Sequence, residues 1–309
     1  MHLLNKIVSR GSWLVSDFLF KLTGLYCLEV NSPTMGFFAQ LGSLLPLLVY
    51  CHDRQLKPHI VLSSHLYAED DRGFNFLDYF FTGPTYTAAQ RRLLQVLPIR
   101  KSRSFVDIQI WSRYTYPSLD TSAAFFRQYY RLRPEFAMEA DNFAQRHFIP
   151  GRTLGVHYRG TDKATEASEI SFEYTLQCIK QCRRQNPALD TVFVATDTTE
   201  YLEFLRRELQ DVRLVVRDEI RSPNDKPVHL SGLGTPYQNG RDALLSSLLL
   251  SRCDVLLKTM SNLSGWAKVF NPELPVHIMN RPDKAGIAWL GFPEREMIEK
   301  QWFAVALPI

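Results

Sequence analysis

At 309 residues the chain is long enough for two domains, and its 45% hydrophobic and 22% charged residues are typical of an ordinary soluble globular protein. The formal net charge of +4 is mild for this length and no concentrated basic stripe is present, which argues against a nucleic-acid-binding protein. The five cysteines are an odd number, without a Cys-x-x-Cys pair and without histidines at metal-ligand spacing. We therefore expect free thiols in a reducing compartment and no metal site.

The amino-terminal segment 1–24 superficially resembles a signal peptide, because Lys6 and Arg10 precede a run of apolar residues. Asp17 and Lys21 interrupt this run, and no small-residue cleavage site follows it. The run is also too short and too charged to span a bilayer. The segment predicts an amphipathic helix that packs on the body of the protein, with an interfacial membrane helix as the alternative.

A strand, a glycine turn, a helix and a second strand come next. Leu25–Val30 is expected to form the first strand. The apolar spacing after Gly36 is helical, with Pro46 either kinking the helix or marking a late start. Residues 59–62 return as a second strand. This unit indicates the start of an α/β domain.

The pattern weakens between residues 63 and 120, where residues 70–73 are expected to form a loop and residues 105–111 alternate as a strand does. Two helical segments between residues 122 and 148 are separated at Pro134.

Pro150 and Gly151 mark the expected domain boundary. Residues 1–150 are predicted to form one α/β domain. Residues 151–309 are predicted to form a second α/β domain, with a carboxyl-terminal tail that can cross back to the first domain.

Strands and helices alternate regularly from residue 153 onward. Strands are expected at residues 154–158, 191–195, 212–216, 254–257 and 276–279, and helices at residues 172–184, 200–209, 240–251 and, capped by residues 259–264, up to residue 269. Strand-helix units of this length imply a parallel, doubly wound sheet. The eight units of a TIM barrel are not reached.

Polar residues follow three of these strands, at residues 157–163, at Thr196 and Asp197, and at residues 258–264. The carboxyl ends of strands in a doubly wound sheet face one crevice, so these clusters can converge. A single strand-end aspartate is more often a helix cap than a ligand, but the joint placement of the three clusters favours a functional site.

The chemistry of these strand ends suits a phosphate group. Helix starts after Thr198 and Ser261 would offer backbone amides to an anion, and Arg159 supplies a forked cation. A glycine-rich dinucleotide fingerprint, a Walker A loop and a Gly-x-Ser-x-Gly elbow are absent from the sequence. A nucleotide or nucleotide-sugar site follows as a hypothesis.

The segment His157-Tyr-Arg159-Gly-Thr161-Asp162-Lys163 resembles the His-x-Arg-x-Thr-Asp-Lys signature of the α1,6-fucosyltransferases, including the rhizobial nodulation fucosyltransferase, and more distantly the protein O-fucosyltransferases. Ala195-Thr196-Asp197 resembles their second motif, and the segment from Asp254 to Asn262 resembles their third. The order and the strand-end context agree over roughly the carboxyl-terminal half. The glycine turn at Gly36 is similar to the first turn of their amino-terminal domain.

This resemblance implies a GT-B architecture, in which two Rossmann-like domains face each other across a cleft. Residues 1–150 would form the acceptor-side domain and residues 151–309 the nucleotide-sugar-binding domain. It implies an inverting, metal-independent transferase with GDP-fucose as co-substrate and no other cofactor. Arg159 would bind the donor β-phosphate and stabilise its departure. The implied substrate-binding residues are His157 at the guanine or ribose, Thr161, Asp162, Lys163 and Tyr174 around the donor loop, Asp197 at the nucleoside, Ser261 and Asn262 at the diphosphate, and Gly36 in the first domain.

Two positions depart from the family pattern. The α1,6 enzymes have a second arginine after the first, where this chain has Gly160. The base-reading aspartate of the third motif falls, counting back from Asp254, at Ser246. Asp242 lies one helical turn earlier on the same face and is the candidate to take its place.

The sequence therefore predicts a glycosyltransferase that transfers fucose from GDP-fucose to a glycan acceptor. A glycosyltransferase with another nucleotide sugar, and a non-catalytic nucleotide- or glycan-binding module, are the alternatives. Asp70, Asp71 and Asp107 lie in the acceptor-side half, but none of them is assigned as the general base. We expect a cytoplasmic enzyme of polysaccharide biosynthesis, with possible peripheral membrane contact through the amino-terminal helix and no nucleic-acid partner.

Overall fold

The computed structural model describes residues 18–102, 118–160, 170–221, 228–280, 294–300 and 302. Several sequence-based expectations lie outside the described residues: the amino-terminal helix before residue 18, the strand at residues 105–111 with Asp107, and the loop residues Thr161, Asp162 and Lys163. Residues 18–23 are helical, with Phe20 buried and with Phe18 and Leu22 exposed by 67% and 72%. In the described part of the chain, no helix is both long and apolar enough to cross a membrane.

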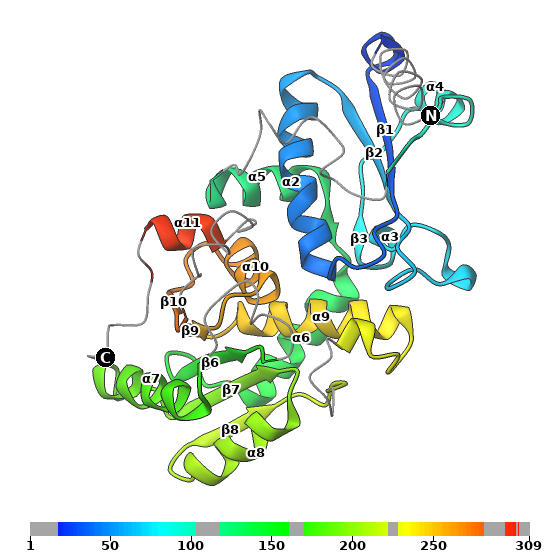
Figure 1. Cartoon of the computed structure of the whole chain (residues 1–309). Coiled ribbons are helices and arrows are strands. Elements are labelled where there is room, and N and C mark those ends of the chain that lie inside the picture. The colour runs from blue at the N-terminus through cyan, green and yellow to red at the C-terminus, as the bar shows by residue number, and fades with distance from the viewer. Residues whose placement is uncertain are drawn as a thin grey trace, which may run out of the picture.

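A three-stranded parallel sheet forms the first layer of the amino-terminal half. Its order is β2-β1-β4, from Lys57–Leu62, Leu25–Val30 and Arg100–Ser102. Helix α2 (Phe37–Asp53) connects β1 to β2 and packs against this sheet (Figure 1). Pro46 lies inside α2, so the helix starts early and runs through the proline.

Short elements follow β2, which explains why the sequence pattern is weak there. They are η1 (Asp70–Arg72), α3 (Leu77–Phe80), β3 (Phe81–Thr82) and α4 (Ala88–Leu94). The expected loop at residues 70–73 contains one turn of 3₁₀ helix and ends at Gly73, whose φ of 91° favours glycine. Elements of this length bury too few residues to show a clear period.

Helices α5 (Leu119–Tyr129) and α6 (Pro134–His147) are separated at Pro134, as predicted. Pro134 occupies the first turn of α6, where its missing N–H has no intrahelical partner to lose. Between them, β5 (Arg131–Leu132) pairs antiparallel with β3. Helix α6 then packs against α9 (Pro236–Leu250) of the carboxyl-terminal half.

The carboxyl-terminal half contains the predicted parallel sheet, with the order β10-β9-β6-β7-β8. Its strands are β6 (Thr153–Tyr158), β7 (Thr191–Thr196), β8 (Arg213–Val216), β9 (Val255–Lys258) and β10 (Val276–Ile278); besides α9, its helices are α7 (Phe172–Gln185), α8 (Thr199–Glu208), α10 (Asn262–Phe270) and, after residue 293, α11 (Glu294–Glu299). Each predicted strand and helix of this half is present within a few residues of its expected bounds, and α9 begins one turn earlier than expected.

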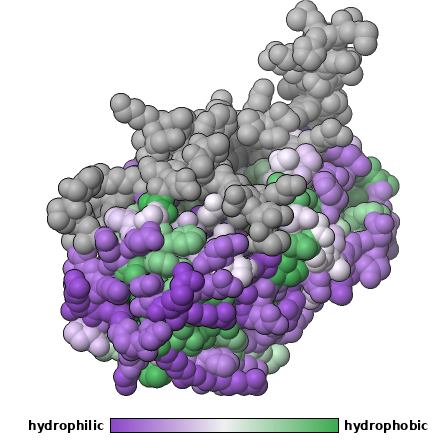
Figure 2. Space-filling view, turned by 60° about the horizontal axis from the view of Figure 1, so that its bottom comes forward, coloured by the Kyte–Doolittle hydropathy of each residue, from purple (hydrophilic) through white to green (hydrophobic). Residues whose placement is uncertain are grey.

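Helices cover both faces of this sheet. Val192 and Val194 of β7 pack with residues of α7 and α8, whereas Phe193 and Ala195 join the cluster that includes α9 and α10. This alternation buries every residue of β6 and β7. Figure 1 shows α7 and α8 on the outer side and α6, α9 and α10 between the two sheets. Viewed from below, the described surface is mostly hydrophilic, with scattered apolar residues (Figure 2).

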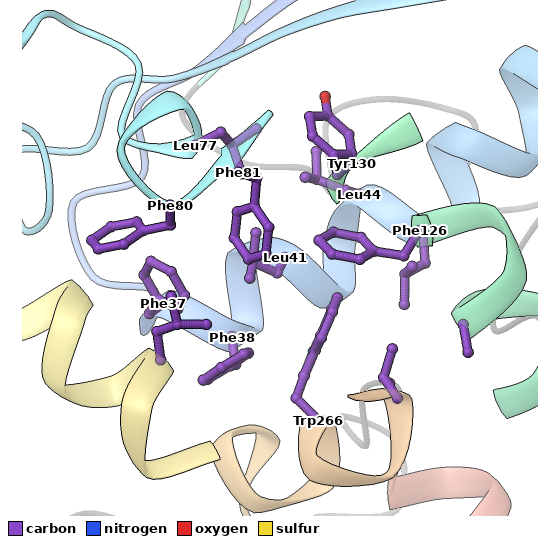
Figure 3. Close-up of a cluster of buried hydrophobic side chains, with 14 of the residues drawn as sticks. Phe37, Phe38, Leu41, Leu44, Leu77, Phe80, Phe81, Phe126, Tyr130 and Trp266 are labelled. Carbon is purple, nitrogen blue, oxygen red and sulfur yellow. The ribbon is translucent and has the colours of Figure 1, made fainter. Parts of the chain in front are cut away.

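An aromatic cluster joins the two halves. The Trp266 ring of α10 lies 5.5 Å from Phe38 of α2 and 4.9 Å from Phe126 of α5, measured between ring centroids. Phe80 of α3 lies 5.3 Å from Phe37, and Figure 3 shows these side chains gathered between the helices. All five side chains are at most 3% exposed, so the core is continuous from one half to the other.

Candidate active site

The strand order of the second sheet indicates a candidate ligand site between β6 and β9. Read from β8, the order is β8-β7-β6-β9-β10, so the direction of strand addition reverses after β6. Ligands of open parallel sheets bind outside the carboxyl ends of the strands at such a reversal. The Arg159 N–H donates to Thr259 Oγ1 at 3.0 Å, and the Thr259 N–H donates to the His157 carbonyl oxygen at 2.9 Å. These bonds hold the two strand ends together and place Arg159 at the reversal.

Asp197 brings the end of β7 to the same place. Its Oδ1 accepts from the Gly160 N–H at 3.4 Å, and its Oδ2 lies 4.0 Å from Arg159 Nε. Because the Arg159 and Asp197 side chains are 21% and 18% exposed, solvent screens part of this long ion pair. The ends of β6, β7 and β9, which the sequence assigned to one crevice, therefore do meet. Asp197 contacts both the Gly160 backbone and the Arg159 guanidinium, so it restrains both groups.

Gly160 stands where the α1,6 enzymes have a second arginine, and close packing explains the glycine. A Cβ at this position would lie 2.9 Å from Tyr158 Cε1 and 3.4 Å from Thr198 Cγ2. The Tyr158 ring is itself stacked on Tyr201 at 4.2 Å. A larger side chain at residue 160 would have to displace this ring stack.

His157 is a buried, neutral group under the crevice. It is 5% exposed and stands opposite the fully buried Lys258 in the register of β6 and β9. Burial, followed by the positive charges of Lys258 and Arg159, lowers the pKa of His157 well below its usual value. Its Nδ1 has no hydrogen-bond partner in the described part of the chain. The imidazole can therefore give or accept a hydrogen bond toward a ligand without carrying charge.

Two helix starts lie beyond the ends of β7 and β9. Thr198 is the N-cap of α8 and Ser261 the N-cap of α10, and neither side chain makes a capping bond to the helix backbone. Asn262 is the first residue of α10 and is partly exposed. The first N–H groups of a helix lack intrahelical partners, so both starts favour an anionic group.

The amino-terminal half approaches Arg159 through Tyr67, whose hydroxyl accepts the Phe37 N–H of α2 at 2.8 Å. Burial raises the pKa of Tyr67, and the Phe37 bond and the charge of Arg159 oppose that shift, so Arg159 lies within electrostatic reach. The His229 ring, in η5 (Val228–Leu230), stacks on Tyr67 at 6.3 Å. A Cβ on Gly36 would lie 3.9 Å from His229 Cε1, so the start of α2 lies beside His229 and Tyr67.

Sequence reasoning missed Tyr67 and His229. Tyr67 lies in the connection that follows β2, so the strand-end rule applied to the second half would have pointed to this loop as well. His229 lies in a short 3₁₀ segment without a pattern that could have indicated it.

Tyr174 lies in the first turn of α7, where its N–H donates to Ser171 Oγ at 3.2 Å. Its ring packs against the apolar cluster that α7 and α8 form with the sheet, and its hydroxyl pairs with the Cys178 thiol. These contacts explain its position by packing. Its contribution to donor binding stays a prediction.

Asp242 and Ser246 lie on α9, and both contact residues that follow β8. Asp242 Oδ1 accepts from Arg217 Nη1 at 2.8 Å, and Ser246 Oγ donates to Glu219 Oε2 at 2.5 Å. Sequence reasoning missed Arg217 and Glu219, although they directly follow a predicted strand as the three chosen clusters do. The strand-end rule, applied to all strands, would have found them.

The described residues contain no group of three or more His, Cys, Asp or Glu side chains arranged to hold a metal ion. Asp70 and Asp71 are exposed on η1.

A separate cavity of about 540 Å³ lies at the junction of the two halves. Its lining combines side chains of both charges with aromatic rings: Arg72, Asp78, Tyr79, Arg133, Glu135, Phe136, Glu139, Tyr237 and Arg241.

Known proteins resemble this chain in fold and in family. Among solved structures, the NodZ α-1,6-fucosyltransferase soaked with GDP-fucose is 16% identical, with a TM-score of 0.53, and the match covers 81% of this chain and 94% of that chain. Fucosyltransferase NodZ from Bradyrhizobium is also 16% identical, with a TM-score of 0.52, over 81% of this chain and 95% of that chain. This likeness confirms the expected GT-B-like α/β fold.

A search among curated proteins found no match. The family model described as nodulation protein Z (NodZ) matches residues 118–287, which is more than half of the chain and includes β6, β7 and β9 with their polar ends. The chain therefore belongs to the nodulation protein Z family.

Proposed function

We propose that this chain is a fucosyltransferase that transfers fucose from GDP-fucose to a glycan acceptor. The observation that carries the proposal is the position of Arg159 at the strand-order reversal, joined to the ends of β7 and β9 by Asp197 and Thr259. Family membership supports the same reading, since a NodZ structure of the same fold is described as an α-1,6-fucosyltransferase soaked with GDP-fucose.

The arrangement suggests how the donor is activated. The diphosphate would lie at the starts of α8 and α10, near Ser261 and Asn262, with Arg159 beside its β-phosphate. When the bond from the fucose C1 to the phosphate oxygen breaks, negative charge grows on the diphosphate. The Arg159 guanidinium stabilises this charge more in the transition state than in the ground state, which accelerates transfer.

His157 and Asp197 would support this step. The neutral His157 imidazole would form a hydrogen bond to the nucleoside. The nucleoside carries no charge, so it needs no cation besides Arg159, which pairs with the diphosphate. Asp197 would hold the Arg159 side chain and contact the nucleoside side of the donor. Thr161, Asp162, Lys163 and Tyr174 remain proposed neighbours of the donor.

The acceptor would enter from the amino-terminal half. We propose residues 1–150 as the acceptor side and residues 151–309 as the donor side, because Tyr67, which lies beside Gly36, is within electrostatic reach of Arg159. Attack by an acceptor hydroxyl on the face of C1 opposite the diphosphate would invert the anomeric centre. With Arg159 and two helix starts supplying positive potential, a metal ion is not required by this scheme.

Calorimetric titration with GDP, UDP, ADP and CMP tests the donor assignment. GDP should bind at least tenfold more tightly than the other three, and incubation with GDP-fucose should release GDP and, with water as the acceptor, free fucose. Preference for UDP would favour the second candidate function, a transferase for another nucleotide sugar, which Ser246 in the base-reading position supports. GDP binding without any turnover would favour a binding module.

We also propose a reducing, cytoplasmic location with peripheral membrane contact. All five cysteines are free, which suits a reducing compartment. The exposed Phe18 and Leu22 lie one helical turn apart and would enter the lipid interface. Flotation with anionic vesicles should recover the protein, and Phe18→Ser should reduce recovery; equal recovery for both would contradict membrane contact at this position.

A further inference from the structure

The carboxylate of Glu219, which follows β8, contacts Ser246 of α9, the position at which the resembled family pattern has a base-reading aspartate. Residues 217–219 directly follow β8, at the same edge of the parallel sheet as Arg159 and Asp197. The Glu219 side chain is 9% exposed and the Arg217 side chain is 10% exposed. A buried carboxylate at a ligand-binding edge of a sheet is costly unless it is paired, and it is selective when one oxygen still faces a ligand.

The contacts of Glu219 distinguish its two oxygens. Oε2 accepts from Ser246 Oγ at 2.5 Å and from Arg217 Nη2 at 2.8 Å. Oε1 has a longer contact, 3.4 Å from Arg221 Nη2. Since a carboxylate oxygen accepts about two hydrogen bonds, the contacts among the described residues fill Oε2 and leave Oε1 with capacity for one further donor.

Asp242 is engaged in a different way. Its Oδ1 accepts from Arg217 Nη1 at 2.8 Å, and its Oδ2 lies 3.4 Å from the Ile220 N–H. Arg217 thus holds Asp242 and Glu219 apart, with Asp242 anchoring the arginine and Glu219 reaching Ser246. Of the two carboxylates, Glu219 is the one that contacts Ser246, whose hydroxyl also accepts from Arg217 Nη2 at 3.3 Å.

We infer that Glu219, and not Asp242, is the carboxylate that recognises the donor base. This assignment rests on the proposed function and adds a specificity residue to it. The Watson–Crick edge of guanine presents an amino group at C2, and the remaining lone pair of Glu219 Oε1 can accept one hydrogen bond from it. Adenine and hypoxanthine carry no amino group at C2, so the Glu219 carboxylate selects guanine over both.

Calorimetry with GDP and inosine diphosphate tests the inference, because these ligands differ by one amino group. Wild-type protein should bind GDP roughly 10- to 100-fold more tightly, as a hydrogen bond to a charged group commonly contributes. Glu219→Gln should weaken GDP binding and bring the ratio of the two affinities close to one. Asp242→Asn should keep the ratio. Glu203→Gln, an exposed carboxylate on α8, is the matched control.

Glu219→Gln also removes a partner of two arginines, so folding is checked by circular dichroism and thermal unfolding. Glu219→Asp keeps the charge but shortens the side chain, and should reduce the ratio in a protein that retains its ion pairs. An unchanged ratio in the folded Glu219 variants, or its loss in Asp242→Asn alone, would overturn the assignment to Glu219. Failure of wild-type protein to bind GDP would overturn the proposed function together with it.

Discussion

The two walls of the candidate active site are built differently. Arg159, His157 and Asp197 lie at the ends of β6 and β7, whose residues are all buried between two layers of helices. Gly36 and Tyr67 lie in connections of a three-stranded sheet that is followed by elements of two to seven residues. Rigid strand ends can fix a diphosphate, whereas loops can vary with the acceptor. We therefore expect donor chemistry to depend on the carboxyl-terminal half and acceptor choice to depend on the amino-terminal half.

A substitution in the aromatic cluster that joins the two halves should have the largest effect on stability. Trp266→Ala removes the fully buried ring that contacts Phe38 and Phe126, and should lower the free energy of unfolding by about 3–5 kcal/mol in urea denaturation. Met138→Ala, at a side chain 58% exposed on α6, should change it by less than about 0.5 kcal/mol. Equal losses in the two variants would show that the aromatic cluster does not hold the halves together.

The buried histidine of the rigid wall predicts a pH dependence of stability. The lowered pKa of folded His157 means that only the unfolded state takes up a proton just below the usual value of 6.5. Its contribution to stability is therefore complete above that pH and falls as the pH drops toward the folded pKa, by at most about 1.4 kcal/mol per pH unit. His157→Gln should flatten this slope when unfolding is measured at about pH 7 and about pH 5. Identical slopes in both proteins would contradict a neutral, buried His157.

Among these substitutions, replacement of Asp197 should have the smallest effect, and the quantity affected is kcat/KM. Its ion pair with Arg159 is 4.0 Å long and partly exposed, so Asp197→Asn should lower kcat/KM for GDP-fucose by roughly two- to fivefold. Asp211→Asn, which breaks an exposed pair with Arg183, is the control and should have no effect on transfer. A loss of several hundredfold in Asp197→Asn would mean that this carboxylate takes part in the chemistry itself.

The sequence allowed the carboxyl-terminal sheet to be predicted almost strand by strand, because its strands are long, apolar and separated by amphipathic helices. The convergence of Arg159, Asp197 and Thr259 followed from one topological rule. The amino-terminal half was harder because β3, β5 and η1 contain only two or three residues each, too few for a period. Tyr67 and His229 come together through tertiary contacts alone.

The Asp242 hypothesis shows a different limit. Helical spacing correctly placed Asp242 and Ser246 on one helix, but spacing within a helix carries no information about the loop after β8. Arg217 pairs with Asp242, and Glu219, which lies 27 residues before Ser246 in the sequence, accepts a hydrogen bond from Ser246. A carboxylate that comes from a distant part of the chain can be identified only from the contact between the end of β8 and α9.

Substitution of Arg159 removes the guanidinium on which the proposed fucosyl transfer depends. Release of GDP from GDP-fucose should fall roughly 10²- to 10³-fold in Arg159→Ala, because the growing charge on the diphosphate loses its stabilising guanidinium. Arg159→Lys should recover part of the rate, since a lysine keeps the charge but not the fork. Thermal unfolding of both variants should match that of the wild-type protein. Wild-type turnover in a folded Arg159→Ala protein would contradict a role for Arg159 in stabilising the departing diphosphate.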